Sequence, residues 1–181
     1  LRDLRHRDGG FFAAEDADSE GVEGKFYVWR PDEVRRLLGT DADAALAWWD
    51  ITEPGNFEGA TILNRVHGSP TDEEPAEIAA ARARMLEARG TRVRPGLDDK
   101  VLTEWNALMT ATLAEAGAAT GETAWVDAAV ANAEFLLAHL RGPDRRWLRS
   151  WQDDGSGGRA QHLALAVDHA ALLDAFVRLA E

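Results

Sequence analysis

The chain has 181 residues, 45% of them hydrophobic, which predicts a globular protein with one ordinary core. Its 32 acidic and 20 basic residues give a net charge of −12 at pH 7, which repels phosphate backbones and anionic membrane surfaces. The sequence lacks an apolar run near the roughly 20 residues of a membrane span, and it lacks a signal-peptide pattern. We therefore expect a cytoplasmic protein without nucleic-acid or membrane partners.

The absence of cysteine excludes disulfides and thiol redox chemistry within this chain. Both ends of the sequence lie inside helical patterns, because Leu1–Arg5 resembles the last turn of a helix and helical periodicity continues to Glu181. We therefore expect residues 1–181 to be a single fragment of a larger domain.

The first predicted elements are a long loop and two short helices. Residues 9–29 pass through an acidic stretch and end in Lys25–Trp29, whose aromatic and β-branched residues favour a short strand. Pro31 at a first helical position and Gly39 after two leucines delimit one helix. Asp43–Trp49 makes a second helix, so the pair is predicted to form a helical hairpin.

The middle of the chain is predicted to contain one extended segment and one helix. Residues 61–66 are short and apolar, which is typical of a strand or an extended segment. Residues 73–89, which end at Gly90, are rich in Ala, Arg and Glu and predict a helix. Its charges alternate in sign, which favours a solvated face.

Two long helices are predicted next. Leu102–Ala119 has the character of a fully buried helix, and Gly121 separates it from a helix over Thr123–Leu140. The short connection predicts an antiparallel hairpin. The second helix carries an amphipathic stripe at spacings of four, three, four and four: Trp125, Ala129, Asn132, Leu136 and Leu140.

Residues 147–161 contain two strand-like edges around a Gly-rich turn, and Leu163–Glu181 is predicted to be the last helix. Long helix pairs joined by Gly-rich loops predict a mostly α fold, in which this chain is a portion of an (α/α) helical-hairpin toroid with short β-hairpin-like loops.

The acidic stretch packs five carboxylates into nine residues: Glu15, Asp16, Asp18, Glu20 and Glu23. Three interpretations are open. A calcium loop matches the early spacing of an EF-hand, but Tyr27 occupies the twelfth position, where a bidentate Glu belongs. A ligand loop would use carboxylates to accept hydrogen bonds from hydroxyls or to transfer a proton, and a solvated turn would use them to cap local amides.

A second polar cluster occupies the start of an otherwise apolar helix. Asp98, Asp99, Lys100, Trp105 and Asn106 lie within nine residues of one another. One aspartate is explained as a helix N-cap, but the second and the lysine are not. At the mouth of a cavity, these residues would provide an aromatic platform and an amide.

Asp168 lies on the apolar stripe of the last helix. A carboxylate in that position is costly unless it is paired or functional, and Arg159 is a candidate partner. His162 and His169 are seven residues apart and are expected to share a helix face. Four of the seven tryptophans lie in or beside polar loops, where indole rings suit stacking on sugars or ordinary core packing: Trp29, Trp105, Trp147 and Trp151.

Three blocks of the sequence carry a family resemblance: residues 9–29, 55–59 and 98–106. In this order they resemble the thioredoxin-domain-containing family related to the spermatogenesis-associated thioredoxin-like proteins. The resemblance runs over essentially the whole chain. The chain departs from the family at Glu104-Trp-Asn-Ala107, where the family usually has Ser-Trp-Asn-Gly, and at Asp168-His169, where it has Asp-Tyr.

The resemblance implies a parent with a thioredoxin-like domain followed by a helical barrel similar to N-acylglucosamine 2-epimerases and six-hairpin glycosidases. In such barrels, loops at the inner helix ends line one bowl, and on that analogy the polar residues converge there. The expected catalytic residues are Asp98, Asp99, Lys100 and Asp16. The expected ligand-binding residues are Glu15, Asp18, Tyr27, Trp105, Asn106 and Asp168. We expect no cofactor and no metal.

Two functional hypotheses follow. The first is a carbohydrate-handling barrel fragment, epimerase-like, isomerase-like or glycosidase-like, with a small polyhydroxylated ligand. The second is a non-catalytic recognition or scaffold module that works with the thioredoxin-like domain of the same parent. Under either hypothesis we expect the isolated fragment to be inactive and to self-associate through its apolar edges.

Overall fold

The structure is a computed structural model, and it describes residues 1–69 and 73–181. The chain is mostly helical, with 47% helix and 16% strand, which confirms the expected fold class at this level. The toroid stays a prediction. The chain divides into two compact units, each described by itself: unit 1 contains residues 1–15 and 97–181, and unit 2 contains residues 16–96. Within the described residues, no helix is long and apolar enough to cross a membrane.

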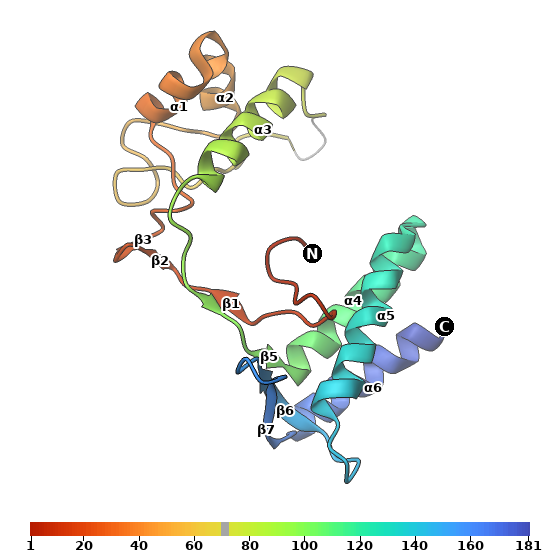
Figure 1. Cartoon of the computed structure of the whole chain (residues 1–181). Coiled ribbons are helices and arrows are strands. Elements are labelled where there is room, and N and C mark those ends of the chain that lie inside the picture. Colours follow the sequence, from red (N-terminus) through yellow and green to blue (C-terminus); the bar gives the residue numbers. More distant parts are fainter. Residues whose placement is uncertain (70–72) are drawn as a thin grey trace. The chain divides into compact units, whose positions relative to one another are not determined.

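Unit 2 is built on three helices: α1 (Pro31–Leu38), α2 (Ala42–Trp48) and α3 (Ala76–Gly90), which pack together in Figure 1. A short 3-10 turn, Gly39–Asp41, joins the first two. Pro31 occupies the first turn of α1 and Gly39 has φ +62°, so both predicted boundaries are confirmed. The core includes Trp29, Val34, Leu38, Trp49, Ile78 and Met85.

Two predictions in unit 2 were wrong in detail. Lys25–Trp29 is not a strand, and only Trp29 pairs, in an isolated bridge with Thr61. The helix predicted from residue 73 begins at Ala76. Pro75 explains the later start, because the residue before a proline is disfavoured in helical conformation. The strands of unit 2 lie earlier, as an antiparallel pair of β2 (Asp18–Ser19) and β3 (Val22–Glu23).

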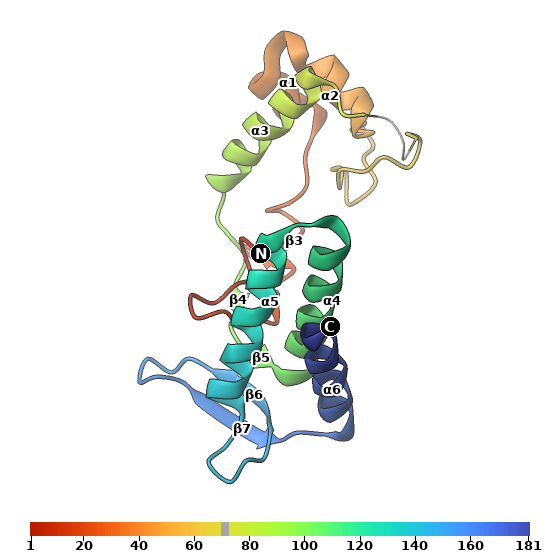
Figure 2. The ribbon, with the colours of Figure 1, turned by 90° about the vertical axis from the view of Figure 1, so that its right-hand side faces the viewer.

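The helices of unit 1 are α4 (Thr103–Thr120), α5 (Thr123–Phe135) and α6 (Ala166–Ala180), which lie side by side in Figures 1 and 2. The connection at Gly121, which has φ +76°, reverses the chain, so α4 and α5 form the predicted antiparallel hairpin. A π-helical segment, Leu136–Leu140, continues α5. Four residues of the predicted α5 stripe are fully buried: Ala129, Asn132, Leu136 and Leu140.

Helix α4 differs from its predicted fully buried character. Trp105, Leu108 and Met109 are 52%, 49% and 39% exposed, and they lie on the face opposite the residues that pack on α5 and α6. The sequence does not reveal this exposed face, because its residues at the start of the helix are apolar, like most of the residues on the buried face. The helix is therefore half-buried, and its exposed surface is apolar over the first two turns.

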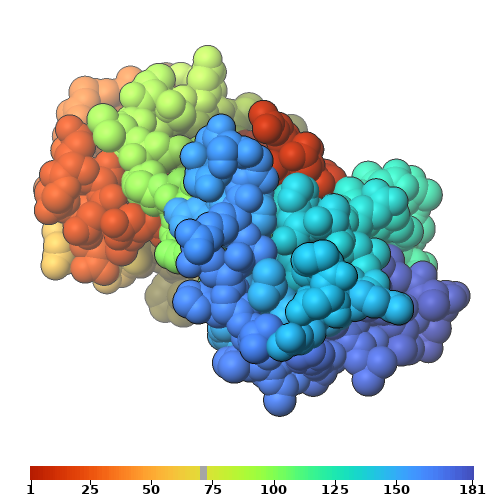
Figure 3. Space-filling model, turned by 60° about the horizontal axis from the view of Figure 1, so that its bottom comes forward, coloured from red at the N-terminus to blue at the C-terminus, as the bar shows by residue number. Residues whose placement is uncertain are grey.

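The strands of unit 1 form two small sheets. β1 (Ala14–Glu15) pairs antiparallel with β4 (Leu97–Asp98). β5 (Val101–Leu102), β6 (Leu148–Gln152) and β7 (Arg159–Leu163) make a three-stranded antiparallel sheet in that order. The strand pair predicted around the Gly-rich turn is thus confirmed. Figure 3 shows the β6–β7 hairpin in blue at the surface of unit 1.

The core of unit 1 joins the sheet to the helices. Trp151 of β6 packs with Phe135, Leu136, Leu140 and Leu172. His6 and His139 flank the same indole, with ring centroids 5.3 Å from it in each case. His162 lies in β7 and not in α6, so the expectation that it shares a helix face with His169 was wrong.

Candidate functional site

The predicted site residues fall in both units. Unit 1 contains Glu15, Asp98, Asp99, Lys100, Trp105, Asn106 and Asp168, and unit 2 contains Asp16, Asp18 and Tyr27. Within unit 1, the pairing of β1 with β4 places Ala14 opposite Asp98 and Glu15 opposite Leu97. The first carboxylate of the acidic stretch and the start of the second polar cluster are therefore neighbours, although more than 80 residues separate them in the sequence.

Asp98, Asp99 and Lys100 form a turn between β4 and β5. The Lys100 ammonium nitrogen lies 2.7 Å and 2.9 Å from the two carboxylate oxygens of Asp98. This hydrogen bond and the backbone N–H of Lys100 hold the pKa of Asp98 below its usual value, against the opposing effect of partial burial. Asp99 accepts a hydrogen bond of 2.6 Å from Gln152 on β6. Neither aspartate caps helix α4.

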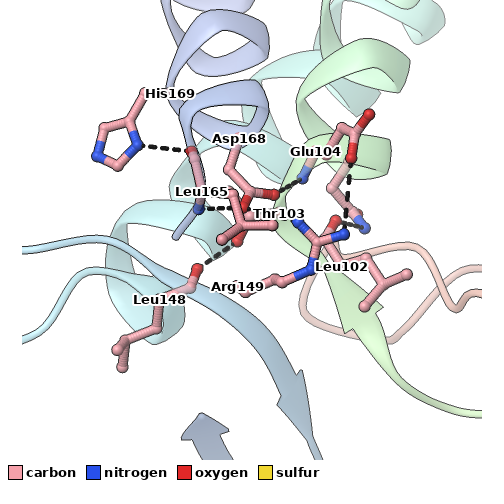
Figure 4. Close-up of polar contacts among 9 residues, drawn as sticks. Leu102, Thr103, Glu104, Leu148, Arg149, Leu165, Asp168 and His169 are labelled. Carbon is pink, nitrogen blue, oxygen red and sulfur yellow. Dashed lines mark hydrogen bonds and ion pairs between the residues drawn. The ribbon is translucent and has the colours of Figure 1, made fainter. Parts of the chain in front are cut away.

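A backbone donor at the start of α4 is satisfied instead by Asp168, which is the third residue of α6 and fully buried. Its carboxylate accepts hydrogen bonds from the backbone N–H of Leu165, at 2.7 Å, and of Glu104, at 3.1 Å. These donors belong to the first turns of α6 and α4, so one carboxylate joins two helix N-termini (Figure 4).

Arg149 completes this network from strand β6, with its Nη1 3.0 Å from the Asp168 carboxylate. The predicted salt bridge of Asp168 with an arginine is therefore confirmed, but the named candidate was wrong, because Arg159 lies on the neighbouring strand β7 and Arg149 forms the pair. Arg149 was missed, although a signal existed. It stands two residues before buried Trp151, and the period of a strand places such a pair on one face.

Asn106 is also buried and makes three hydrogen bonds to main-chain groups. Its Oδ1 accepts from the N–H of Phe11 at 2.7 Å, and its Nδ2 donates to the carbonyls of Phe11 at 3.0 Å and Leu102 at 2.9 Å. Phe11 also forms an isolated antiparallel bridge with Arg5, so the amide ties this N-terminal segment to α4. Asn132 of α5 donates in turn to the carbonyl of Asn106 at 2.9 Å.

A cavity of about 550 Å³ lies beside this junction. Trp105, Met109 and Asn106 of α4 form one wall, and Phe11, Phe12 and Ala13 form another. The segment 1–4 closes a third side and contributes the ion pair of Arg2 with Asp3, 3.0 Å apart. The half-exposed indole of Trp105 is the largest aromatic surface that this cavity offers.

The acidic stretch of unit 2 is a tight hairpin. Glu20 and Gly21, with φ of 54° and 75°, form the two-residue turn between β2 and β3. Glu20 forms an ion pair with Lys25 at 2.7 Å, and the N–H of Asp18 donates to Asp16 at 3.4 Å. Two of the carboxylates in the acidic stretch, those of Glu20 and Asp16, therefore have partners within the hairpin or beside it. Tyr27 is 37% exposed, and its ring packs edge-on against Phe26.

The calcium interpretation gains no support from this hairpin. Among residues 1–69 and 73–181, no group of three or more His, Cys, Asp or Glu side chains is arranged to hold a metal ion. Asp16 and Asp18 are instead engaged locally, as an Asx-type turn that precedes the hairpin.

The chain is mostly helical and consists of two small units. In each unit, short strands and turns with polar residues connect the helices. No family model matches the sequence. The sequence is 30% identical over 203 residues to human spermatogenesis-associated protein 20, and 30% identical over 195 residues to the mouse protein of that name. The two alignments cover 89% and 88% of this chain.

An uncharacterised protein of Caenorhabditis elegans is 30% identical over 220 residues, which cover 99% of this chain. The chain is therefore homologous to a part of these proteins, and the name of the human and mouse proteins matches the family that the three sequence blocks indicated. It spans 30% of the length of the nematode protein and 25% of the human and mouse proteins.

Proposed function

We propose that the cavity beside Trp105 binds a small polyhydroxylated ligand such as a monosaccharide. The observation that carries the proposal is the half-exposed indole at a cavity of about 550 Å³. This volume lies within the range of about 300–1,000 Å³ for small-molecule pockets. An aromatic face suits the apolar face of a sugar ring, and Arg2 and Asp3 add a donor and an acceptor for hydroxyls.

Asn106 has a positioning role in this proposal. Because its side-chain amide is occupied by the backbone of Phe11 and Leu102, it shapes the wall of the cavity and leaves ligand contact to its neighbours. Asp168 also has a positioning role, but an indirect one. It accepts a hydrogen bond from the first turn of α4, and Trp105 belongs to that turn.

In the catalytic form of the proposal, the parent protein moves a proton beside a sugar carbonyl or hydrolyses a glycosidic bond. Asp98 is then the base and not the acid, because the hydrogen bond from Lys100 lowers its pKa and favours the carboxylate form. Asp98 lies in the β4–β5 turn and not among the residues that line the cavity. Asp99 and Lys100 complete the polar turn of unit 1. A two-carboxylate hydrolysis needs a second carboxyl group, and Asp3 is the carboxylate that lines the cavity in the described chain. We expect the isolated chain to bind without turnover.

Thermal unfolding with a panel of monosaccharides tests the proposal, because a ligand that binds only the native state raises the melting temperature. We expect Trp105→Ala to abolish this rise. Leu173→Ala removes an apolar side chain that is 68% exposed and outside the cavity, and it should leave the rise intact. Melting temperatures that stay constant across the panel, for both this chain and the full-length parent, would reject the proposal.

The exposed acidic hairpin favours a second candidate function, recognition of the thioredoxin-like domain of the same parent. In that case, the exposed carboxylates of the hairpin form the docking surface, and Asp18→Asn with Glu23→Gln weakens association between the two domains and leaves turnover unchanged. Loss of turnover with intact association would exclude this alternative.

A further inference from the structure

Unit 2 contains a second pocket, which has no part in the proposed sugar site. Its volume is about 280 Å³, at the small end of the range for ligand pockets. Trp29, Trp49, Leu63, Met85 and Leu86 provide apolar walls. The charged residues that line it are Arg82 and Arg89.

The arginines of helix α3 differ in their partners. Arg82 donates two hydrogen bonds to Glu74, at 2.9 Å and 3.0 Å, and so its charge is compensated. Arg84 donates to the carbonyl of Leu37 and to Asp41. Arg89 makes no hydrogen bond to a carboxylate or to a carbonyl within residues 1–69 and 73–181. No carboxylate there neutralises the charge of its guanidinium.

Aromatic rings hold the Arg89 guanidinium in place. Its central carbon lies 5.3 Å from the ring centroid of Phe26 and 5.5 Å from that of Tyr27, within the range of cation–π attraction. A cation–π contact uses the charge of the guanidinium and none of its N–H donors as hydrogen-bond donors, so these donors remain available to an acceptor.

This arrangement determines the chemistry of a ligand. One uncompensated guanidinium matches one carboxylate, with two parallel hydrogen bonds. The walls around it are apolar, and a doubly charged phosphate would lack a second positive partner. We propose that this pocket binds a small monoanionic carboxylate that carries one hydrophobic ring or branched chain, with Arg89 as the carboxylate partner.

Paired titrations of the full chain test the proposal. The probes are 3-phenylpropanoate and its neutral isostere 3-phenylpropanamide, and the readout is the indole N–H signals in the NMR spectrum of ¹⁵N-tryptophan-labelled protein. We expect the carboxylate to shift the signals of Trp29 and Trp49. We expect the amide to bind at least tenfold more weakly, because it cannot form the charge-assisted pair.

Arg89→Gln should remove the preference for carboxylate over amide. Arg36→Gln is the matched control, because Arg36 lies on α1, pairs with Asp32 and does not line the pocket; it should keep the preference. The wild-type comparison decides the question even if Arg89→Gln fails to fold. Equal affinity for the two probes, no shift at millimolar carboxylate, or an unchanged preference in Arg89→Gln would each overturn the proposal.

Discussion

Asp168 is the residue on which the architecture of unit 1 most depends. It is fully buried, and it serves the N-termini of two helices and one arginine with a single carboxylate. Buried charges are stable only when they are paired and hydrogen-bonded, so the removal of one partner leaves the other uncompensated.

We therefore predict that Asp168→Asn lowers the free energy of unfolding by about 3 kcal/mol, because Arg149 loses its ion pair and two helix ends lose a charged acceptor. Urea denaturation measures the change. Asp174→Asn removes a carboxylate of the same helix that pairs with Arg178 at the surface, and it should cost less than about 1 kcal/mol. Equal costs for the two variants would show that Asp168 has no special role.

The pair of Asp98 and Lys100 gives a prediction about pH. The hydrogen bond from Lys100 lowers the pKa of Asp98 in the folded chain, so the ionised form is the stabilised one. Its contribution to stability is complete above the unfolded pKa of about 3.9 and is lost as the pH falls through the lower folded value. The contribution is small, because both side chains are close to half exposed.

Lys100→Met should raise the pKa of Asp98 towards its usual value, because it removes the side-chain hydrogen bond that stabilises the carboxylate most. Carboxyl ¹³C chemical shifts followed from pH 2 to pH 6 measure this pKa. The variant Arg178→Met removes a cation that pairs with Asp174, and it should leave the Asp98 titration unchanged. An unaltered Asp98 titration in Lys100→Met would contradict the structure of the turn.

At the scale of elements, the α4–α5 hairpin depends on a close approach at Gly117. A Cβ atom at this position would lie 2.7 Å from Val126 Cγ2 and 3.1 Å from the Glu122 carbonyl oxygen. The backbone of the connection would have to move to accept it. The buried polar ladder of Asn106, Thr110 and Asn132 requires the same close packing.

We predict that Gly117→Ala destabilises the protein by about 1–2 kcal/mol, because the steric cost exceeds the gain in helix propensity. Gly90→Ala is the opposite case. No atom lies within 4 Å of a Cβ added to Gly90 at the end of α3, and this variant should raise stability by about 0.5 kcal/mol. Melting temperatures that move in the same direction for both variants would contradict the packing argument.

At the scale of the whole molecule, exposed apolar surface governs association. On α4, Leu108 is 49% exposed, and on α6, Leu173 and Val177 are 68% and 48% exposed. Helices α4 and α6 pack against each other, and exposed apolar surface that is contiguous marks interaction sites in soluble proteins. The net charge of −12 opposes association, so added salt should promote it.

We predict that the chain self-associates and that Leu108→Glu with Leu173→Glu shifts it to the monomer. Size-exclusion chromatography with light scattering at two salt concentrations measures the change. Val66→Glu alters a residue that is 78% exposed on unit 2 and serves as the control, because it should not change the oligomeric state. A monomer of 19.8 kDa at every concentration and salt level would refute this prediction.

The sequence by itself determined the local elements, because their signals are local. Pro31, Gly39 and Gly121 mark helix ends through backbone geometry, and the α5 stripe follows from helical period. The polar cluster at Asp98–Lys100 was evident from residue type, but the prediction that one aspartate caps the following helix was wrong, because these residues lie at the turn between β4 and β5.

Only the tertiary structure decided which polar residues support the fold and which face a cavity. Asp168 caps α4 from 64 residues away, Asn106 binds a backbone 95 residues away, and Arg149 replaces Arg159 as the buried partner. Each choice depends on the pairing of segments distant in sequence. A carboxylate or amide looks the same in the sequence whether its acceptor atoms meet a ligand or a main-chain N–H, because only packing determines which donor reaches it.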